Sequence, residues 1–185
     1  MQNANFETYL FPNGTIEACY LNVTLDIPCE QGSVPPIGVD IRKAEDAQAA
    51  INFAREKNLR LVIKNTGHDF LGRSTARGGF LLWTHHLKDK AYNASFTPQG
   101  SPSTHTYEGR IEQISMNLIY AYIFVSAVTF GAGVQWYEAY GYVDEQGRFI
   151  VGGLSEGGSV GSAGGWVMGG GHSAFSPSLG LGVYG

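Results

Sequence analysis

The sequence contains a loop whose residue types suit the binding of an anion. Residues 64–75 read KNTGHDFLGRST, in which Gly67 and Gly72 bracket polar side chains directly after an apolar segment. Such a loop can turn several backbone N–H groups toward one anion and so hold phosphate oxygens. Arg73 can add positive charge. The pattern is not a Walker loop, because no Gly-Lys-Ser/Thr follows the glycines. His68 can be chemically active here, or simply hydrogen-bonded at a turn.

A second candidate site is the glycine-rich stretch at 152–182. The chain has 26 glycines, and many gather here as GSAGG at 161–165 and GGG at 169–171, on either side of Trp166 and Val167. Glycine lets the backbone lie against a large planar or phosphate-bearing ligand. A Rossmann site would need G-x-G-x-x-G between a strand and a helix, and this spacing is absent at the expected place, which disfavours a nicotinamide cofactor. A low-complexity glycine loop explains the composition but not the recurrent spacing.

The elements that must position the first loop are predicted from apolar periodicity. Gly38–Ile41 reads as a short strand, and Glu45–Asn58 as a helix with acidic residues in its first turn and an alanine-rich face. Leu59–Lys64 alternates apolar and basic residues as a strand and leads directly into the loop. Phe80–Trp83 is a further strand candidate.

The second stretch is preceded by another alternation of strand and helix. Ala127–Gly131 is predicted as a strand and Val134–Gln146 as a helix that ends at Gly147. Phe149–Val151 is predicted as a strand that leads into the glycines. Strands that alternate with helices indicate an α/β or α+β domain.

Composition excludes some classes of protein. Hydrophobic residues make up 43% and charged residues 15% of the 185, which is typical of a globular domain. The net charge of -4 argues against a nucleic-acid surface. Gln113–Tyr137 carries no charge, so we weigh a transmembrane helix against a buried strand or helix, and the glycines after residue 130 disfavour the membrane.

Several N-terminal features indicate a secretory origin. Cys19 and Cys29 can form a disulfide or remain two thiols, and spacing alone does not decide. N-glycosylation sequons begin at Asn13, Asn22 and Asn93. We expect a secreted or secretory-pathway protein by ancestry. Residues 1–10 have neither a basic nor an apolar leader region, so the localisation of this product itself stays open.

Taken together, the loop at 64–75 and the segment VGSAGGWVMGGGHSAFSPSLGLG at 160–182 resemble two signature segments of fungal berberine-bridge-enzyme-like FAD-linked oxidoreductases. This family belongs to the vanillyl-alcohol-oxidase (VAO) flavoprotein superfamily. PCEQGSVP at 28–35, LWTHHLKD at 82–89 and AVTFGAG at 127–133 also match. The resemblance therefore runs from about Cys29 to Gly182, with an apolar block at 110–126 that interrupts it.

The resemblance implies an α+β fold, the PCMH-type FAD-binding domain, with a small α/β subdomain and the start of a second, incomplete one. We expect residues 1–33 to form an N-terminal segment and residues 34–185 the FAD-binding domain. The loop would hold the pyrophosphate of FAD, and His68 would bond covalently to a methyl carbon of the flavin. The predicted cofactor-binding residues are His68, Asn65, Thr66, Gly67, Asp69, Phe70, Gly72, Arg73, Ser74, Gly153, Val160, Gly161, Gly164, Gly165, Gly170 and His172.

Many members of the resembled family add a second flavin link through a cysteine just before Val-Gly. Here Ser159 precedes Val160 and Gly161, so only single attachment through His68 is expected. His172 is a poor candidate for linkage and is given a backbone-orienting or flavin-edge role. No metal is expected.

The implied function is oxidation of a small organic substrate by hydride transfer to FAD, with molecular oxygen as acceptor. No catalytic base can be named, because that part of the family pattern would follow residue 185. The pattern also lacks the block at 110–126, which we interpret as translated intron or an aberrant insertion. The alternative function is a non-catalytic truncated or mis-spliced fragment of such an enzyme, with poor solubility.

Overall fold

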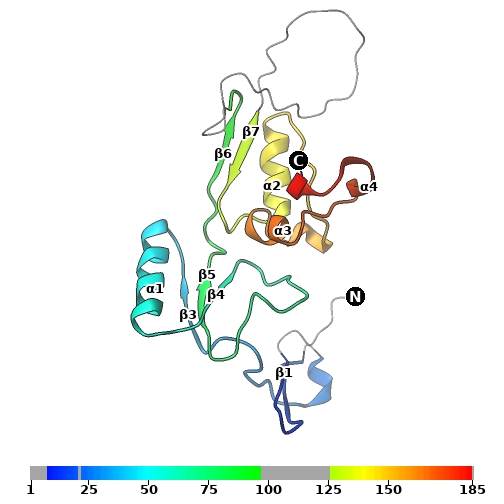
Figure 1. The fold of residues 1–185 in the computed structure, drawn as a ribbon. Helices are drawn as coiled ribbons and strands as arrows, with labels where there is room; N and C mark the ends of the chain where they lie inside the picture. Colours follow the sequence, from blue (N-terminus) through cyan, green and yellow to red (C-terminus); the bar gives the residue numbers. More distant parts are fainter. Residues whose placement is uncertain (1–7, 21, 97–125, 185) are drawn as a thin grey trace, which may run out of the picture.

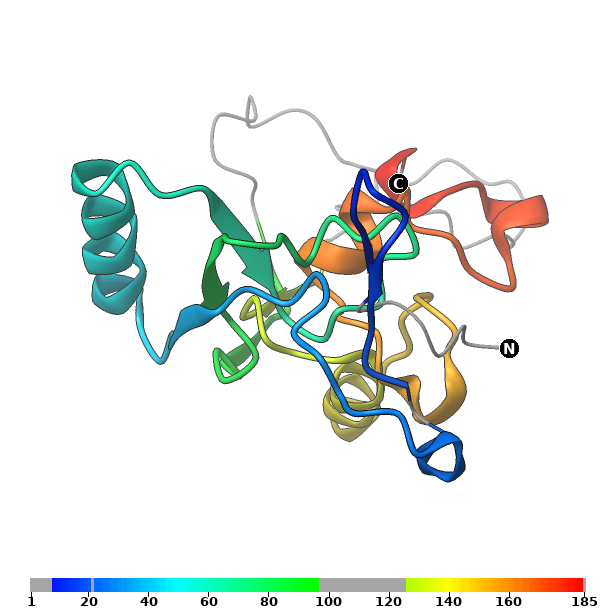
Figure 2. The same ribbon diagram turned by 90° about the horizontal axis from the view of Figure 1, so that it is seen from below.

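The structure of the protein is a computed structural model that describes residues 8–20, 22–96 and 126–184. Strands and helices are mixed along this part of the chain, so the α+β class is confirmed. A parallel sheet with one covering helix forms one region, and an antiparallel strand pair with three α-helices forms the other (Figure 1). The helix of the first region and the last helix of the second lie at opposite sides of the molecule (Figure 2).

The parallel sheet has the strand order β3 (Ile37–Asp40), β5 (Phe80–Trp83), β4 (Leu61–Lys64). Helix α1 (Ala44–Glu56) connects the two outer strands. The four predictions for this region are therefore confirmed within about two residues at each boundary. Helix α1 begins where the Asp46 carboxylate accepts the N–H groups of Arg42 and Lys43, and it ends before Asn58, which adopts a left-handed φ of 53°.

The core of this region lies between α1 and the sheet. Ala50 and Ala54 of the helix pack against Phe80 and Leu82 of the central strand and against Ile41. Small side chains on the helix let it approach the sheet closely, and the larger apolar residues are supplied by the strands. Since the sheet is parallel, the carboxyl ends of its strands lie at one edge, and the predicted loop at 64–75 begins at that edge.

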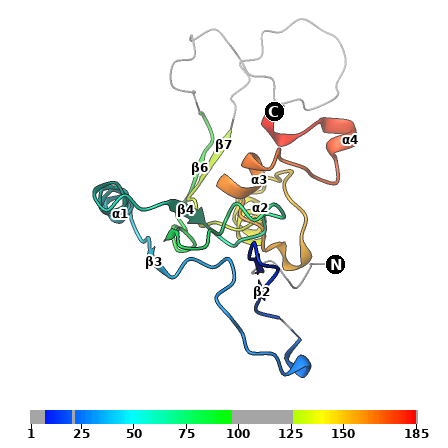
Figure 3. The same cartoon turned by 60° about the horizontal axis from the view of Figure 1, so that its bottom comes forward.

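The second region begins with β6 (Lys90–Asn93), which pairs antiparallel with β7 (Ala127–Phe130). Figure 3 shows this strand pair extending away from the parallel sheet. Helix α2 (Trp136–Glu145) follows, and Gly147 ends it with a φ of 63° and an N–H donated to Asp144 O, as predicted. Val134, Trp136 and Ala139 form a second core.

The remaining elements after α2 are short: η2 (Glu156–Gly158), α3 (Gly164–Met168), α4 (Ser176–Leu179) and η3 (Gly182–Tyr184). The prediction of a strand at Phe149–Val151 is wrong. These residues are irregular and Phe149 is 91% exposed. Apolar side chains alone do not make a strand, because a strand needs a neighbour for its backbone hydrogen bonds.

The N-terminal segment contains short regular elements that the sequence did not predict. A small hairpin pairs β1 (Tyr9–Leu10) with β2 (Ile16–Glu17), and η1 (Val23–Leu25) follows. A disulfide joins Cys19 and Cys29, which decides between the two states left open by the sequence.

Most of the apolar block at 110–126, and the stretch 113–125 of the candidate membrane segment, lie outside the described residues. Within the described ranges, no helix has the length and apolarity that a membrane span requires.

Candidate functional site

Polar side chains meet at the carboxyl edge of the parallel sheet. Asn65 follows β4, and His85 follows β5. The Oδ1 atom of Asn65 lies 3.1 Å from Nδ1 of His85, and the backbone oxygen of Asn65 accepts the indole N–H of Trp83 at 2.9 Å. Burial lowers the pKa of His85, and the charges of Lys88 and His86 lower it further, which favours the neutral form of this ring. In open parallel sheets this edge is the usual place for a ligand.

The loop that leaves this edge is organised by two glycines and one ion pair. Gly67 and Gly72 adopt φ values of 90° and 71°, which only glycine reaches without strain. The Asp69 carboxylate accepts from the backbone N–H of Arg73 at 2.6 Å and from its guanidinium at 2.6 and 2.9 Å. These hydrogen bonds hold the pKa of Asp69 below its ordinary value. The positive charge predicted to aid anion binding is thus paired within the loop.

The two predicted sites meet in the folded chain. Nε2 of His68 lies 2.9 Å from Oγ of Ser159, although 91 residues separate them. Beside this contact, a Cβ atom on Gly161 would lie 2.6 Å from Nδ2 of Asn65, so a larger residue at 161 would require the Asn65 side chain to move. The Nδ2 atom itself is buried, and no atom of the described residues forms a hydrogen bond with it. The loop extends beneath α3 in Figure 1.

Backbone contacts hold the second segment in place. Gly161 forms an antiparallel bridge with Gln135, and Ser162 donates both its backbone N–H and its hydroxyl to Val134 O. Trp136 N–H donates to Val160 O at 2.9 Å.

An ion pair then ties α2, against which this segment packs, to the first region. Lys88 donates to Glu138 at 2.6 Å and to Gly133 O at 2.7 Å. Gly131 and Gly133 pass so close to the backbone of residues 84–89 that a Cβ on either would overlap it. The position of the glycine-rich segment therefore depends on close backbone packing.

The glycines of the second segment serve different purposes. A Cβ on Gly153 would lie 2.7 Å from the Trp136 ring and 2.8 Å from the Trp166 ring, so this residue is required for packing. Gly170 has a φ of 98°, so its backbone conformation accounts for it. Gly164 and Gly165 have neither a positive φ nor a neighbour within 4 Å of the place that a Cβ atom would take, and both are exposed. Nothing within the described part of the chain requires glycine at these two positions.

The other predicted site residues vary in exposure. Thr66 and Ser74 are half-buried, and Phe70 is 74% exposed. Val160 packs against the second core. The side chain of His172 is exposed, and its backbone oxygen accepts the indole N–H of Trp166 at 2.6 Å.

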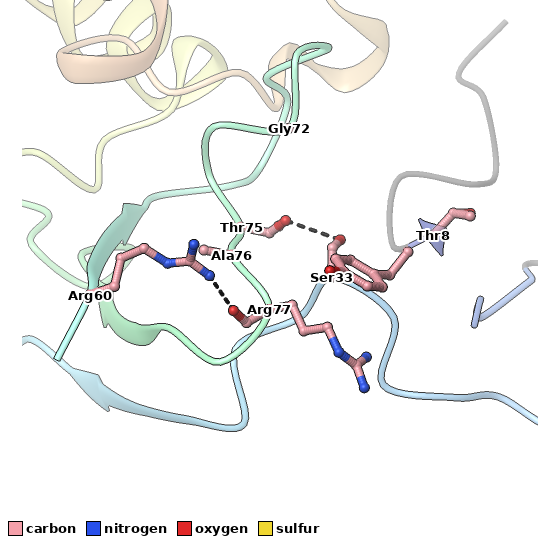
Figure 4. Close-up of a pocket in the computed structure, with 8 residues that line it drawn as sticks. Thr8, Ser33, Arg60, Gly72, Thr75, Ala76 and Arg77 are labelled. Carbon is pink, nitrogen blue, oxygen red and sulfur yellow. Dashed lines mark hydrogen bonds between the residues drawn. The ribbon is translucent and has the colours of Figure 1, made fainter. Parts of the chain in front are cut away.

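A separate cavity of about 430 Å³ lies between the N-terminal hairpin and the second half of the loop. Figure 4 shows Thr75 hydrogen-bonded to Ser33 and Arg60 to the backbone oxygen of Arg77 along its walls. Arg77 pairs with Glu17, and its guanidinium stacks on the rings of Tyr9 and Phe11. Neither His68 nor the glycine-rich segment lines this cavity.

Sequence reasoning missed Ser159 and His85 as site residues. Each lies in a segment that the sequence had singled out, but the contact that gives it a role is formed with a residue far along the chain. Among the described residues, no group of His, Cys, Asp and Glu side chains could hold a metal ion.

Comparison with known proteins identifies relatives along nearly the whole chain. An FAD-linked oxidoreductase of Arthroderma benhamiae is 40% identical over 182 residues, which is 98% of this chain and 27% of that protein. No protein-family model matches the chain.

Two crystal structures of proteins from Myceliophthora thermophila C1 also match. The VAO-type flavoprotein MtVAO615 superimposes with a TM-score of 0.64 and 37% identity, over 83% of this chain and 24% of its own. The VAO-type flavoprotein MtVAO713 superimposes with a TM-score of 0.69 and 28% identity, over 91% of this chain and 27% of its own. This chain thus spans about a quarter of the length of the relatives that it matches.

Proposed function

This chain belongs to the VAO-type FAD-linked oxidoreductases and corresponds to one segment of those longer proteins, and we propose that it binds FAD. The proposed binding site is the place where the loop at 65–75 meets the segment at 159–165. The observation that carries the proposal is the contact between His68 and Ser159 at 2.9 Å, beside the close approach of Asn65 to Gly161. These contacts join the loop suited to phosphate with the segment suited to a large planar ligand.

The residues present fit this cofactor. The buried Nδ2 of Asn65 is a donor that no described protein atom satisfies, and an unsatisfied buried donor is rare unless a ligand or solvent supplies its acceptor. Gly164 and Gly165 leave the backbone open to close approach, where neither packing nor φ requires glycine. The remaining residues predicted to contact FAD stay part of this proposal.

His68 is the residue that would tether the cofactor through its imidazole. The bound FAD would supply the redox chemistry, taking a hydride from a small organic substrate and passing the electrons to molecular oxygen. The chain would position the reacting groups: the loop holds His68, and the glycine-rich segment holds Ser159 opposite it. The finer assignment to the berberine-bridge-enzyme-like group rests on the sequence segments already described.

The test compares two histidine variants of the purified chain. We expect the wild-type chain to show flavin absorbance and to keep its fluorescence in a denaturing gel, and His68→Ala to lose the gel fluorescence. His172→Ala is the comparison variant, because His172 is an exposed histidine on the other segment and is not expected to form the link; its gel fluorescence should persist even if it contacts the flavin. Fluorescence that survives in His68→Ala would refute the tether. A colourless wild-type chain would instead favour the non-catalytic alternative.

We also propose passage through the secretory pathway with N-glycosylation. Asn13, Asn22 and Asn93 are all exposed, and each side-chain oxygen accepts the N–H of the residue two positions later. The disulfide between Cys19 and Cys29 suits an oxidising compartment. Expression in a eukaryotic secretory host should give a mass that falls on deglycosylation, and each Asn→Gln variant should lose one step. A mass equal to that of the bare chain would overturn this proposal.

A further inference from the structure

The side chain of Arg77, just beyond the end of the loop, is surrounded by the N-terminal segment. Its guanidinium pairs with the Glu17 carboxylate and donates to the backbone oxygen of Gly32 at 2.9 Å. The same group lies 4.9 Å from the ring centre of Tyr9 and 4.8 Å from that of Phe11. A guanidinium over aromatic rings is attracted to them, and more strongly where water is partly excluded. Arg77 is therefore held by ionic, polar and aromatic contacts at once.

The hairpin that supplies three of these contacts is very short. Strands β1 and β2 have two residues each, and Tyr9 lies directly opposite Glu17 in their register. The rings of Tyr9 and Phe11 meet edge to face at 4.9 Å. A lone two-stranded hairpin is at best marginally stable in water, so this one needs a group to pack on. The guanidinium of Arg77 is such a group, and the hairpin and the arginine hold each other in place.

The disulfide keeps the two oxygen acceptors of Arg77 close together. Cys19 lies two residues after Glu17, and Cys29 lies three residues before Gly32. A cross-link between two points of a chain reduces the conformational freedom that is lost when those points are brought together. The bond between the cysteines thus favours the arrangement in which one guanidinium reaches both acceptors.

The contact with the N-terminal segment extends into the loop through consecutive turns. The Thr75 hydroxyl donates to Oγ of Ser33 at 3.1 Å, which gives the segment a second hold on the loop (Figure 4). The backbone N–H of Thr75 donates to Gly72 O at 3.3 Å, and that of Gly72 donates to Asp69 O at 3.0 Å. Asp69 adjoins His68. A displacement of Thr75 would therefore move the turns that carry the proposed tether.

We propose that Arg77 is a positioning residue for FAD binding, and that the disulfide between Cys19 and Cys29 maintains the contacts through which it acts. This inference rests on the proposed function, because the loop that Arg77 steadies is the loop proposed to hold the cofactor. Arg77 acts through the backbone of that loop and not by touching FAD.

Replacing the side chain at 77 should leave the parallel sheet intact. The end of the loop is held to the sheet by Arg60, whose side chain donates to the backbone oxygen of Arg77. Gly79 N–H donates to Ala76 O at 2.8 Å, and Phe80 N–H donates to Arg60 O at 2.8 Å. These contacts use the backbone of the loop, which a substitution at 77 keeps. The expected change is therefore a local loosening of the loop and not a loss of the fold.

The first experiment measures amide hydrogen exchange of the chain without flavin. We expect exchange across residues 69–77 to become about tenfold faster in Arg77→Met, because the contacts that hold the loop closed are lost. The sheet amides of Ile41 and Thr84, which donate across the strands, should exchange as in the wild type. Arg55→Met is the matched control, because Arg55 is exposed on α1 and forms no ion pair with another described residue.

Two further samples extend this experiment. Wild-type chain treated with dithiothreitol, which reduces the disulfide to two thiols and is itself oxidised to a cyclic disulfide, should show the same faster exchange in the loop. Arg77→Lys keeps a cation beside Glu17 and the rings, so its loop should exchange more slowly than that of Arg77→Met. Loop exchange that stays at the wild-type rate in both Arg77→Met and the reduced chain would overturn the inference. Equal acceleration of loop and sheet amides would also overturn it, because the role would then be stability of the whole fold.

The second experiment measures FAD affinity by equilibrium titration. We expect a dissociation constant about tenfold higher in Arg77→Met and in the double variant Cys19→Ala/Cys29→Ala, and a wild-type value in Arg55→Met. The disulfide is removed here by substitution, since a thiol reductant would also react with the flavin. Wild-type affinity in both test variants would refute the positioning role. If the wild-type chain binds no FAD, the proposed function fails, while the exchange rates still decide whether Arg77 and the disulfide hold the loop.

Discussion

The two regions of this molecule are held together by opposite means. In the first, α1 lies on a parallel sheet, and large apolar side chains such as Phe80 and Leu82 fill the space between them. In the second, Gly131, Gly133 and Gly153 let backbone and ring atoms approach where no side chain fits. Truncating a core side chain should therefore destabilise the first region, and adding a Cβ atom at one of these glycines should destabilise the second.

The largest effect is expected from Leu82→Ala in the first region. Leu82 is 3% exposed and packs in the central strand, so its truncation leaves a cavity and should cost about 2–5 kcal/mol of unfolding free energy. Ile63→Ala on the neighbouring strand is the control, because Ile63 is 58% exposed and its loss should change stability by about 0.5 kcal/mol or less. Urea unfolding measures both variants. Equal losses would show that the sheet core does not hold this region.

The second region should lose stability when an atom is added, as in Gly133→Ala. The added Cβ would overlap the carbonyl oxygens of Thr84 and His85, which belong to the backbone and cannot rotate aside. We expect a loss of about 1–3 kcal/mol, and a weaker hold on flavin if the proposed function is right, because this contact places the glycine-rich segment. The same unfolding experiment, with bound flavin as a second readout, tests this. A fully stable variant would contradict the close approach.

The sequence predicted the first region better than the second, because local periodicity reveals individual elements but not their distant partners. The strands and helix of the first region follow from local periodicity, and the predicted strand Phe80–Trp83 has its observed bounds. The pairing of β6 with β7 and the hairpin of β1 with β2 were not predicted, because two to four residues carry too little pattern to reveal a distant partner. Phe149–Val151 has the composition of a strand but no partner strand among the described residues.

The candidate site also has features that the sequence predicted and features that depend on distant contacts. The loop around His68 and the segment around Gly161 are identified by their glycine spacing, and the structure brings them into contact. Sequence could not reveal the contact of Ser159 with His68, since a serine has no signature until its partner is known. Nor could it separate Gly153, which packs on tryptophan, from Gly165, which faces open space.

A smaller effect is expected at the ion pair that joins the two regions. Burial alone would raise the pKa of Glu138, but hydrogen bonds from Lys88 and Gln135, together with the charges of Lys88 and Lys90, outweigh it and lower the pKa below its ordinary value. The folded carboxyl thus has a lower pKa than the unfolded one. Its contribution is complete above about pH 4.3 and is lost as the pH falls through the folded-state value.

Glu138→Gln should therefore lower stability by about 1 kcal/mol at pH 7 and by less in acid. Unfolding curves recorded from pH 7 down to pH 3 measure this dependence, and the difference between wild type and variant should shrink along the series. A difference that stays constant with pH would show that the carboxylate charge is not what joins the regions.

The smallest effect on stability is expected at glycines that no contact requires, and it separates a glycine of the proposed site from one outside it. Gly141 lies inside α2, and none of the described residues comes within 4 Å of the place that a Cβ atom would take, so Gly141→Ala should raise stability by about 0.5–1 kcal/mol through helix propensity. Gly165 in α3 has the same open surroundings, and Gly165→Ala should be similarly harmless to the fold. The two variants should differ in flavin binding alone, measured by equilibrium titration, because only Gly165 belongs to the proposed site. If Gly165→Ala binds FAD as tightly as Gly141→Ala, no ligand approaches the backbone there, and the glycine at 165 has no account in either the fold or the site.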